Sequence, residues 1–429
     1  MSGAPAQAVS RPSPTSVIVV SRGRPDHLRL CLTALGQQYH PNFEIILVAD
    51  PDGLTQRPDL LIKRVGFNLP NISQARNLGI AQAAGAVIAF IDDDSVAEPT
   101  WLSRLTAPFA DPDVIAATGW TRDRDGLRWQ SRSQRIAADS LPQNLPPHQG
   151  TQLLAPEDGA AVSTLGTNCA FRATALRQIG GFDPIFAYHL DESDVNMRMA
   201  ATFPQGLTAV VPDAPVIHAR AGSARRDAAS VPVDLTAQGR SAALFTRRHG
   251  GQTPDAALLR RHRRRMIRAM LDGQMDPLQI DPVLGTLRAG LSAGRAMPLD
   301  APPPPRADLP AAFRRIGNLT HEHAVIGGWH WHAPSLRAQA VDLLSQGVIA
   351  TVILITPSFL PHRIRLTEGG WFEQTGGVWG PSEPDDSPVS HWQMRNRLSR
   401  ETKLANGRRN LTFSGNVAAP RLFRCRTCA

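Results

Sequence analysis

Three consecutive aspartates, Asp92, Asp93 and Asp94, follow the apolar residues Ala89–Ile91. Two carboxylates spaced as Asp-x-Asp can ligate a hard divalent cation, whose charge removes the repulsion between them. Mg²⁺ or Mn²⁺ bound in this way can bridge the phosphates of a nucleotide and stabilise a leaving diphosphate. A solvated acidic turn, or a helix start capped by Asp94 or Ser95, is the alternative interpretation.

The triplet ends the third apolar segment of a regular series. Continuous apolar runs predict buried strands at 16–20, 43–50 and 86–92, and helical spacing of apolar residues predicts helices at 24–38 and 71–84. This order predicts a parallel α/β sheet with right-handed connections, in which ligands bind beyond the carboxyl ends of the strands. The polar residues that follow the first two strands should therefore lie beside the triplet, which favours a metal site.

Composition divides the chain further. We expect a flexible leader at 1–15, an α/β domain at 16–250 and a basic helical segment at 251–298. A Pro-rich linker at 299–310 and a C-terminal region of unassigned fold at 311–429 should follow. Within the last region only a helix followed by a strand, at 335–356, is predicted. Four scattered cysteines and the lack of an apolar leader or membrane span predict a cytoplasmic protein.

The formal charge of +9 comes almost wholly from arginine, since Lys63 and Lys403 are the only lysines. This charge favours anionic partners such as phosphates or an anionic membrane surface. Arg260–Arg268 would form a cationic helix, either docked peripherally on the inner membrane face or packed on the domain with a solvated side. Because aromatic residues are not interspersed there, we expect no nucleic-acid binding.

Four segments in order resemble the family 2 glycosyltransferases, which are inverting enzymes of the GT-A fold. The segments begin "SVIVVSRGRPD", "NISQARNLGIAQAAGAVIAFIDDDS", "GTNCAFRATALRQIGGFDPIF" and "DESDVNMRM", and the resemblance covers roughly residues 16–250. It implies a Rossmann-like, mostly parallel sheet flanked by helices. It also implies transfer of a sugar from a nucleotide-diphosphate donor, with UDP-sugars favoured, to a hydroxyl of a saccharide or lipid-linked acceptor in bacterial surface polysaccharide or glycolipid synthesis.

The resemblance also implies roles for individual residues. The metal, Mn²⁺ or Mg²⁺, would be held by Asp92, Asp94 and His218, with Asp94 as the main direct ligand. The residues implied on the donor side are Ser21, Arg22, Arg24, Asp50, Arg76, Asp92 and Asp93, and those on the acceptor side are Asn168, Phe171, Asp183 and Asp194. Ordinary turns, packing and salt bridges, including Asp194 with Arg198 one helical turn apart, are the alternatives for these residues.

An inverting transfer needs one general base to take the proton of the attacking hydroxyl. The family usually has Glu-Asp at the start of its acidic helix, whereas this chain has Asp191 followed by Glu192. Register favours Glu192 as the base and residue type favours Asp191. The reversed order leaves open a catalytically degenerate glycan- or nucleotide-binding scaffold. Nucleotidyl transfer is disfavoured, because "SRGRPD" has one glycine where a Gly-rich diphosphate loop would be needed.

Overall fold

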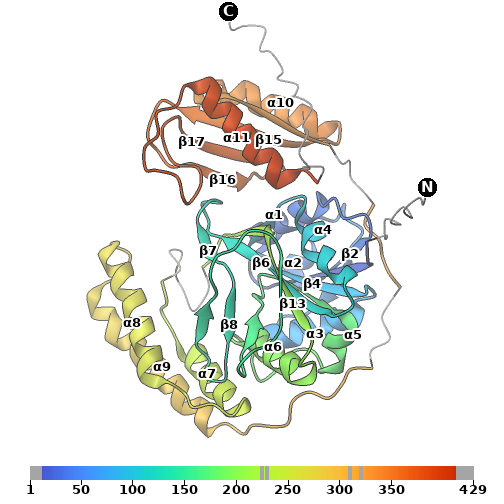
Figure 1. Ribbon diagram of the computed structural model, residues 1–429, viewed down its shortest axis with the longest axis vertical. Helices are drawn as coiled ribbons and strands as arrows, with labels where there is room; N and C mark the ends of the chain where they lie inside the picture. Colours follow the sequence, from blue (N-terminus) through green and yellow to red (C-terminus); the bar gives the residue numbers. More distant parts are fainter. Residues whose placement is uncertain (1–11, 223–226, 228–230, 308–311, 318–321, 412–429) are drawn as a thin grey trace, which may run out of the picture.

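The computed structural model describes residues 12–222, 227, 231–307, 312–317 and 322–411 (Figure 1). Residues 1–11 of the expected leader and 308–310 of the expected linker lie outside the described residues. Within the described ranges, no helix is at once long enough and apolar enough to pass through a bilayer.

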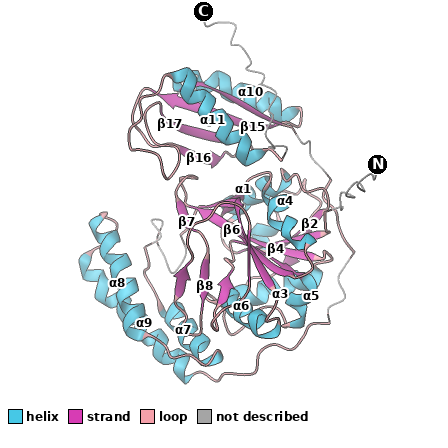
Figure 2. Cartoon of the chain, viewed as in Figure 1, coloured by secondary structure: helices cyan, strands magenta, loops and turns pink. Residues whose placement is uncertain are grey.

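A twisted sheet forms the centre of the protein, with its strands in the order β10-β13-β6-β12-β4-β1-β2-β3, while β5 pairs with β13 and β7 with β6 (Figure 2). Its strands are β1 (Thr15–Ser21), β2 (Phe43–Ala49), β3 (Lys63–Gly66), β4 (Val87–Asp92), β5 (Ser95–Ala97), β6 (Val114–Arg122), β7 (Trp129–Ser131), β10 (Gln152–Leu154), β12 (Asn168–Arg172) and β13 (Leu207–His218). The strands β3, β2, β1, β4, β6 and β13 all run in the same direction. Between β4 and β6 lies β12, which is antiparallel to both. The predicted mostly parallel α/β sheet is confirmed.

Helices cover both faces of this sheet because the strands bury side chains on both sides. On β1, Val17 and Val19 join a core cluster with residues of α1 and α4, whereas Ile18 joins a cluster with residues of α3, α5 and α6. The helices of this part are α1 (Pro25–Gly36), α2 (Pro51–Leu54), α3 (Ile72–Gln82), α4 (Trp101–Thr106), the 3₁₀ turn η1 (Ala107–Ala110), α5 (Ala173–Gln178) and α6 (Asp191–Thr202).

A helical unit packs against one end of the sheet. It contains α7 (Thr236–Arg248), α8 (Asp255–Leu271), the 3₁₀ turn η2 (Pro277–Gln279) and α9 (Ile280–Ala296), next to a small sheet of β11 (Ala161–Ser163), β8 (Gln134–Ile136) and β9 (Pro142–Asn144). Its apolar cluster includes Ile136 of the small sheet and Leu190, the residue directly before α6. Packing of the helical unit therefore fixes where the acidic helix α6 begins.

The C-terminal region forms a second α/β unit. Its sheet has the order β14-β15-β17-β16, in which only β16 is antiparallel to its neighbour. The elements are β14 (His323–Trp329), the 3₁₀ turn η3 (His330–His332), α10 (Ala333–Ser345), β15 (Ile349–Thr356), β16 (Arg363–Leu366), β17 (Phe372–Gly377) and α11 (Met394–Arg409). The helix and strand predicted within 335–356 are confirmed as α10 and β15.

The second unit docks on the first sheet through polar and charged contacts (Figure 1). Arg409 of α11 and Glu98 are both buried and form an ion pair, with 2.6 Å between Nε and Oε2. The Arg409 guanidinium also lies 4.0 Å from the centroid of the Phe372 ring. Thr100 donates a hydrogen bond to the Arg408 carbonyl at 2.7 Å. The two units thus share buried charges, and Ala34 and Tyr39 of the first unit also belong to one apolar cluster with residues of the second.

Candidate active site

A cavity of about 830 Å³ opens at the carboxyl ends of β1 and β4. Its wall combines the loop after β1, the end of β4, the start of α6, the small sheet and one face of α8. This volume lies within the range of roughly 300–1,000 Å³ that small-molecule sites occupy. The position agrees with the rule that parallel sheets bind ligands beyond their strand ends.

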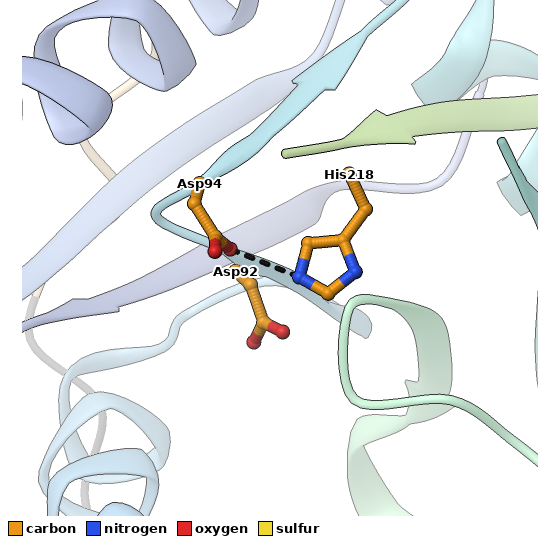
Figure 3. Close-up of side chains that lie close together, drawn as sticks. All are labelled: Asp92, Asp94 and His218. Carbon is orange, nitrogen blue, oxygen red and sulfur yellow. Dashed lines mark ion pairs between the residues drawn. The ribbon is translucent and has the colours of Figure 1, made fainter. Parts of the chain in front are cut away.

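Asp92, Asp94 and His218 meet at one end of this cavity (Figure 3). Pairing of β5 with β13 sets His218 opposite Ser95, directly after the triplet. One potential ligand atom from each of the three residues lies within 4.8 Å of the others. The fold therefore brings His218 beside two aspartates that precede it by more than a hundred residues in the chain.

The contacts of His218 test whether a cation fits there. Its Nδ1 donates a hydrogen bond to Oε1 of Gln130 at 3.1 Å, because an amide oxygen can only accept. The other nitrogen, Nε2, then points a lone pair at Oδ1 of Asp94, 3.1 Å away. Two facing lone pairs need a proton or a cation between them. Carboxylate and imidazole ligands suit Mn²⁺, and carboxylates also suit Mg²⁺.

The middle acid of the triplet points away from the cavity. Asp93 is fully buried, accepts a hydrogen bond from Ser21 Oγ at 2.7 Å and forms an ion pair with Arg24 at 2.6 Å. Burial raises the pKa of Asp93 to about 7, although Arg24 opposes the rise. At Asp94 burial also acts upward, but His218 and Arg24 outweigh it and lower the pKa below its ordinary value. Arg24 therefore relieves the repulsion within the triplet.

Arg76, at the back of the cavity, holds the acids of two different elements. Its buried guanidinium forms an ion pair with Asp191 and lies 3.6 Å from Asp92 and 3.8 Å from Glu192. The ring of Phe182 lies 5.0 Å from the same guanidinium. Arg76 thus links the end of β4 to the start of α6, and in this structure its partners are carboxylates.

Asp191 and Glu192 differ in exposure and in charge. The side chain of Glu192 is 23% exposed and that of Asp191 is 4% exposed. Burial and the neighbouring Glu192 hold the pKa of Asp191 well above its ordinary value. Burial also acts upward on Glu192, but Arg76 and a hydrogen bond from Asp191 lower its pKa. Glu192 is therefore the more accessible member of the pair, and its pKa is the one that is lowered.

The backbone around the acid pair is constrained. His189 and Leu190 both have positive φ angles, 73° and 63°, which is unusual for residues with side chains and marks local strain. Oε1 of Glu192 accepts a hydrogen bond from the Gly166 amide at 3.0 Å. A side chain at Gly166 would collide with Arg76, so glycine is needed for this close approach. These features fix the direction in which Glu192 points.

Two more of the residues predicted on the donor side, Asp50 and Arg22, form hydrogen bonds within the protein. Asp50 caps α2: its Oδ1 accepts from the Gly53 amide at 2.9 Å and its Oδ2 accepts from the Gly23 amide at 2.6 Å. Arg22 donates from Nε to Asn68 Oδ1 at 3.0 Å. Ser21, Arg22, Arg24, Arg76 and Asp92 line the cavity, whereas Asp50 and Asp93 do not. Asp50 instead orders the loop after β1.

The four residues predicted on the acceptor side do not line the cavity. Phe171 is fully buried in the core beneath α3 and α5. Asp183 pairs with Arg248 at 2.7 Å, and Asp194 pairs with Arg198 at 2.7 Å and contacts His249 at 3.1 Å. Each of these side chains points into the protein, and the contacts that it makes there are packing contacts, hydrogen bonds or ion pairs.

Asn168 is the clearest example of a predicted acceptor-side residue with a structural role, and its replacement should test that role. It accepts a hydrogen bond from Trp101 Nε1 at 2.8 Å and donates to the carbonyls of Trp120 and Ala214 at 2.9 and 2.8 Å. Asn168→Ala leaves three buried groups unpaired, and we expect the free energy of unfolding to fall by about 3 kcal/mol. Urea unfolding would measure this loss. Unchanged stability with a raised acceptor KM would instead indicate direct acceptor contact.

The cavity residues that were not predicted at the site include three charged or polar residues of α8. Arg261, His262 and Arg265 of α8 line the wall together with Leu258. Their spacing of three, four and seven residues from Leu258 is the spacing of one helix face. That periodicity was visible in the sequence, but nothing in the sequence indicated that α8 would fold back over the site.

Comparisons with known proteins come from sequence and from solved structures. Residues 16–180 match the family model "Glycosyl transferase family 2". The uncharacterized glycosyltransferase YibD of Escherichia coli (strain K12) is 30% identical over 129 residues, which are 27% of this chain. The matched part spans 37% of the length of that relative.

Among solved structures, GalNAc-T7 with UDP, GalNAc and Mn²⁺ aligns with a TM-score of 0.39 and 16% identity over 49% of this chain and 44% of its own. The mannosyltransferase PcManGT from Pyrobaculum calidifontis, in complex with GDP-Man and Mn²⁺, aligns with a TM-score of 0.37 and 16% identity over 67% of this chain and 76% of its own. S. aureus TarS (residues 1–349) aligns with a TM-score of 0.37 and 15% identity over 65% and 72%.

Proposed function

We propose, from the match of residues 16–180 to the model of glycosyl transferase family 2, that the protein is a metal-dependent, inverting glycosyltransferase. The donor would be a nucleotide-diphosphate sugar, tested first with UDP-sugars, and the acceptor a hydroxyl of a saccharide or lipid-linked saccharide. The observation that carries the proposal is one cavity with a carboxylate–imidazole cluster at one end and a charged acid pair beside it.

Asp92, Asp94 and His218 would hold the cation, which when bound neutralises charge on the diphosphate. Glu192 would accept the proton of the acceptor hydroxyl. The hydroxyl oxygen then forms a bond to the anomeric carbon as the bond from that carbon to the diphosphate oxygen breaks, and the electron pair leaves with the diphosphate. Attack from the face opposite the leaving group inverts the anomeric configuration.

The remaining residues of the site would position these groups. Arg76 would hold Asp191 through their ion pair and balance the charge of the acid pair, so that Glu192 stays directed at the acceptor. Arg24 would fix Asp94 through its own contact at 3.1 Å. Ser21 would hold Asp93 away from the cation. This division of roles fits the finding that Asp93 is absent from the cavity wall.

Donor binding provides the direct test. We expect UDP to bind in the presence of Mn²⁺ or Mg²⁺ and to bind on the order of tenfold or more weakly in EDTA, because the cation bridges protein and diphosphate. Calorimetry with UMP, which lacks the second phosphate, is the matched control and should show little dependence on metal. UDP affinity that is the same with and without EDTA would contradict the proposal.

Turnover separates an enzyme from a non-catalytic scaffold. Incubation with a set of UDP-sugars and Mn²⁺ should release UDP from at least one of them, even when water is the only acceptor. Proton NMR of the first sugar formed should show the anomeric configuration opposite to that of the donor. Metal-dependent UDP binding without release from any donor would indicate the scaffold, and retained configuration would contradict inversion.

A further inference from the structure

One face of α8 forms the cavity wall beyond the acid pair. Leu258, Arg261, His262 and Arg265 all face the cavity, so the face presents two guanidinium groups one helical turn apart. Guanidinium groups bind phosphate through paired, charge-assisted hydrogen bonds. This arginine face, defined here as Arg261 and Arg265, is not used by the chemistry proposed above.

Among the residues that the structure describes, Arg261 has no carboxylate partner in the cavity. The acids that line the wall are Asp92, Asp94, Asp191 and Glu192, and they already face Arg24, Arg76 and the cation site. Among the described residues, no ion pair or hydrogen bond connects Arg261 to an acid. Other arginines of the α8–α9 hairpin do have such partners: Arg263 pairs with Asp281 and Arg295 with Asp255.

His189 interacts with both the acid pair and the arginine face. Glu192 and Arg261 both act on the pKa of His189, so this imidazole lies near both groups. Asp92, by contrast, interacts with Arg76, His218, Asp94 and Glu192. Glu192 therefore interacts both with Asp92 of the cation site and with His189, which in turn interacts with Arg261, and all four residues line the same cavity. An acceptor that presents its hydroxyl to Glu192 would extend toward Arg261.

Two histidines complete this end of the cavity. Burial lowers the pKa of His189 and of His262 to about 4, so both are neutral near pH 7. Neutral imidazoles can still donate hydrogen bonds. Nδ1 of His262 is buried and has no hydrogen-bond partner in the part of the chain that the structure describes. The end of the cavity thus combines positive charge with an unused polar atom.

We propose that the arginine face binds a phosphate group carried by the acceptor, so that the substrate class is a phosphorylated or phospholipid-linked saccharide. This inference rests on the proposed function and names the acceptor of the same site. The cation site would take the donor diphosphate, and Arg261 and Arg265 would take the phosphate at the other end. The hydroxyl to be glycosylated would then lie at Glu192.

The alternative is that α8 binds a membrane surface through its outward arginines. Arg260 and Arg264 are exposed and lie one turn apart, as Arg261 and Arg265 do, but they do not line the cavity. They therefore form a matched control, with the same residue type, spacing and helix but a different direction. A membrane-docking helix would depend on this outward pair, whereas a phosphate subsite would depend on the arginine face.

The test compares two double variants of the full chain, Arg261→Gln with Arg265→Gln and Arg260→Gln with Arg264→Gln. With UDP and Mg²⁺ present and ionic strength constant, ³¹P NMR line broadening would measure binding of glucose 6-phosphate and of inorganic phosphate. We expect glucose 6-phosphate to bind about tenfold or more weakly to the cavity-facing variant, since two charge-assisted contacts are lost, and equally well to the control. Methyl glucoside, which lacks phosphate, should bind both variants alike.

Sedimentation with phosphatidylglycerol vesicles tests whether the phosphate belongs to a phospholipid or to a soluble phosphorylated saccharide. Phosphatidylcholine vesicles, which carry no net charge, are the control. Vesicle binding lost only in the cavity-facing variant would support a phospholipid-linked acceptor. Loss in the outward variant, or equal loss in both, would overturn the inference and indicate membrane docking. Equal affinity of wild type and cavity-facing variant for glucose 6-phosphate would also overturn it.

UDP binding, measured by calorimetry in the same variants, keeps the two proposals apart. It should be unchanged in both double variants. Weaker UDP binding in the cavity-facing variant would assign the arginine face to the donor and overturn the inference. Failure of the wild type to bind UDP with metal would contradict the proposed function itself, whatever the phosphate measurements show.

Discussion

Glu192→Gln should lower the rate of sugar transfer by about a thousandfold, because general-base catalysis contributes roughly 10²–10⁴ to rates of this kind. Glutamine keeps the size of the side chain and an oxygen that can accept from the Gly166 amide. It cannot take a proton. Fold and donor binding should therefore survive, and the loss should appear in kcat, measured as UDP release at saturating donor with metal present.

Asp191→Asn is the matched control for this variant. An asparagine can still donate a hydrogen bond to Glu192, but it loses the ion pair with Arg76. We expect a smaller fall in rate, on the order of tenfold, because the base remains in place but is less well oriented. The opposite ranking, with Asp191→Asn nearly inactive and Glu192→Gln active, would identify Asp191 as the base.

Asp94→Asn should weaken Mn²⁺-dependent UDP binding by at least about 100-fold, the upper end of the losses seen even for outer-sphere partners of bound metals. An amide carries no charge, so it neither offsets the cation nor balances Arg24. Electron paramagnetic resonance of free Mn²⁺, titrated with protein and UDP, would measure the change in metal affinity directly.

Asp93→Asn is the corresponding control, one residue away. Burial raises the pKa of Asp93 to about 7, so a neutral side chain is already close to what this position tolerates. We expect metal affinity to change by less than about threefold and stability to fall by about 1 kcal/mol, through the weaker contact with Arg24. Equal losses of metal binding in the two variants would contradict the division of the triplet into outer ligands and an inner structural acid.

The central sheet could be predicted because its strands are local, continuous apolar runs separated by helical periodicity. The same local rule identified the end of β4 and the polar loop after β1. His218 follows its strand by the same logic, but its distance from Asp94 depends on the pairing of β5 with β13, which is a long-range contact. A resemblance to a family supplied that contact, and periodicity alone would not have done so.

Other features escaped sequence reasoning for definite physical reasons. The small sheet of β8, β9 and β11 has three-residue strands, too short to show a period. The hydrogen bonds of Asn168 join elements far apart in the chain, so the residue looked equally suited to an acceptor pocket. In the sequence Arg261 resembles the other arginines of α8, and only the packing of α8 beside α7 and α9 shows that its side chain lines the cavity.

The buried pair of Arg409 and Glu98 makes the two α/β units cooperative. The Pro-rich stretch between them would suggest two independent domains. Each unit, however, carries one half of a buried charge pair, and an unpartnered buried charge costs about 3–5 kcal/mol. Loss of either partner should therefore destabilise the contact between the two units and couple a change in one unit to the unfolding of the other.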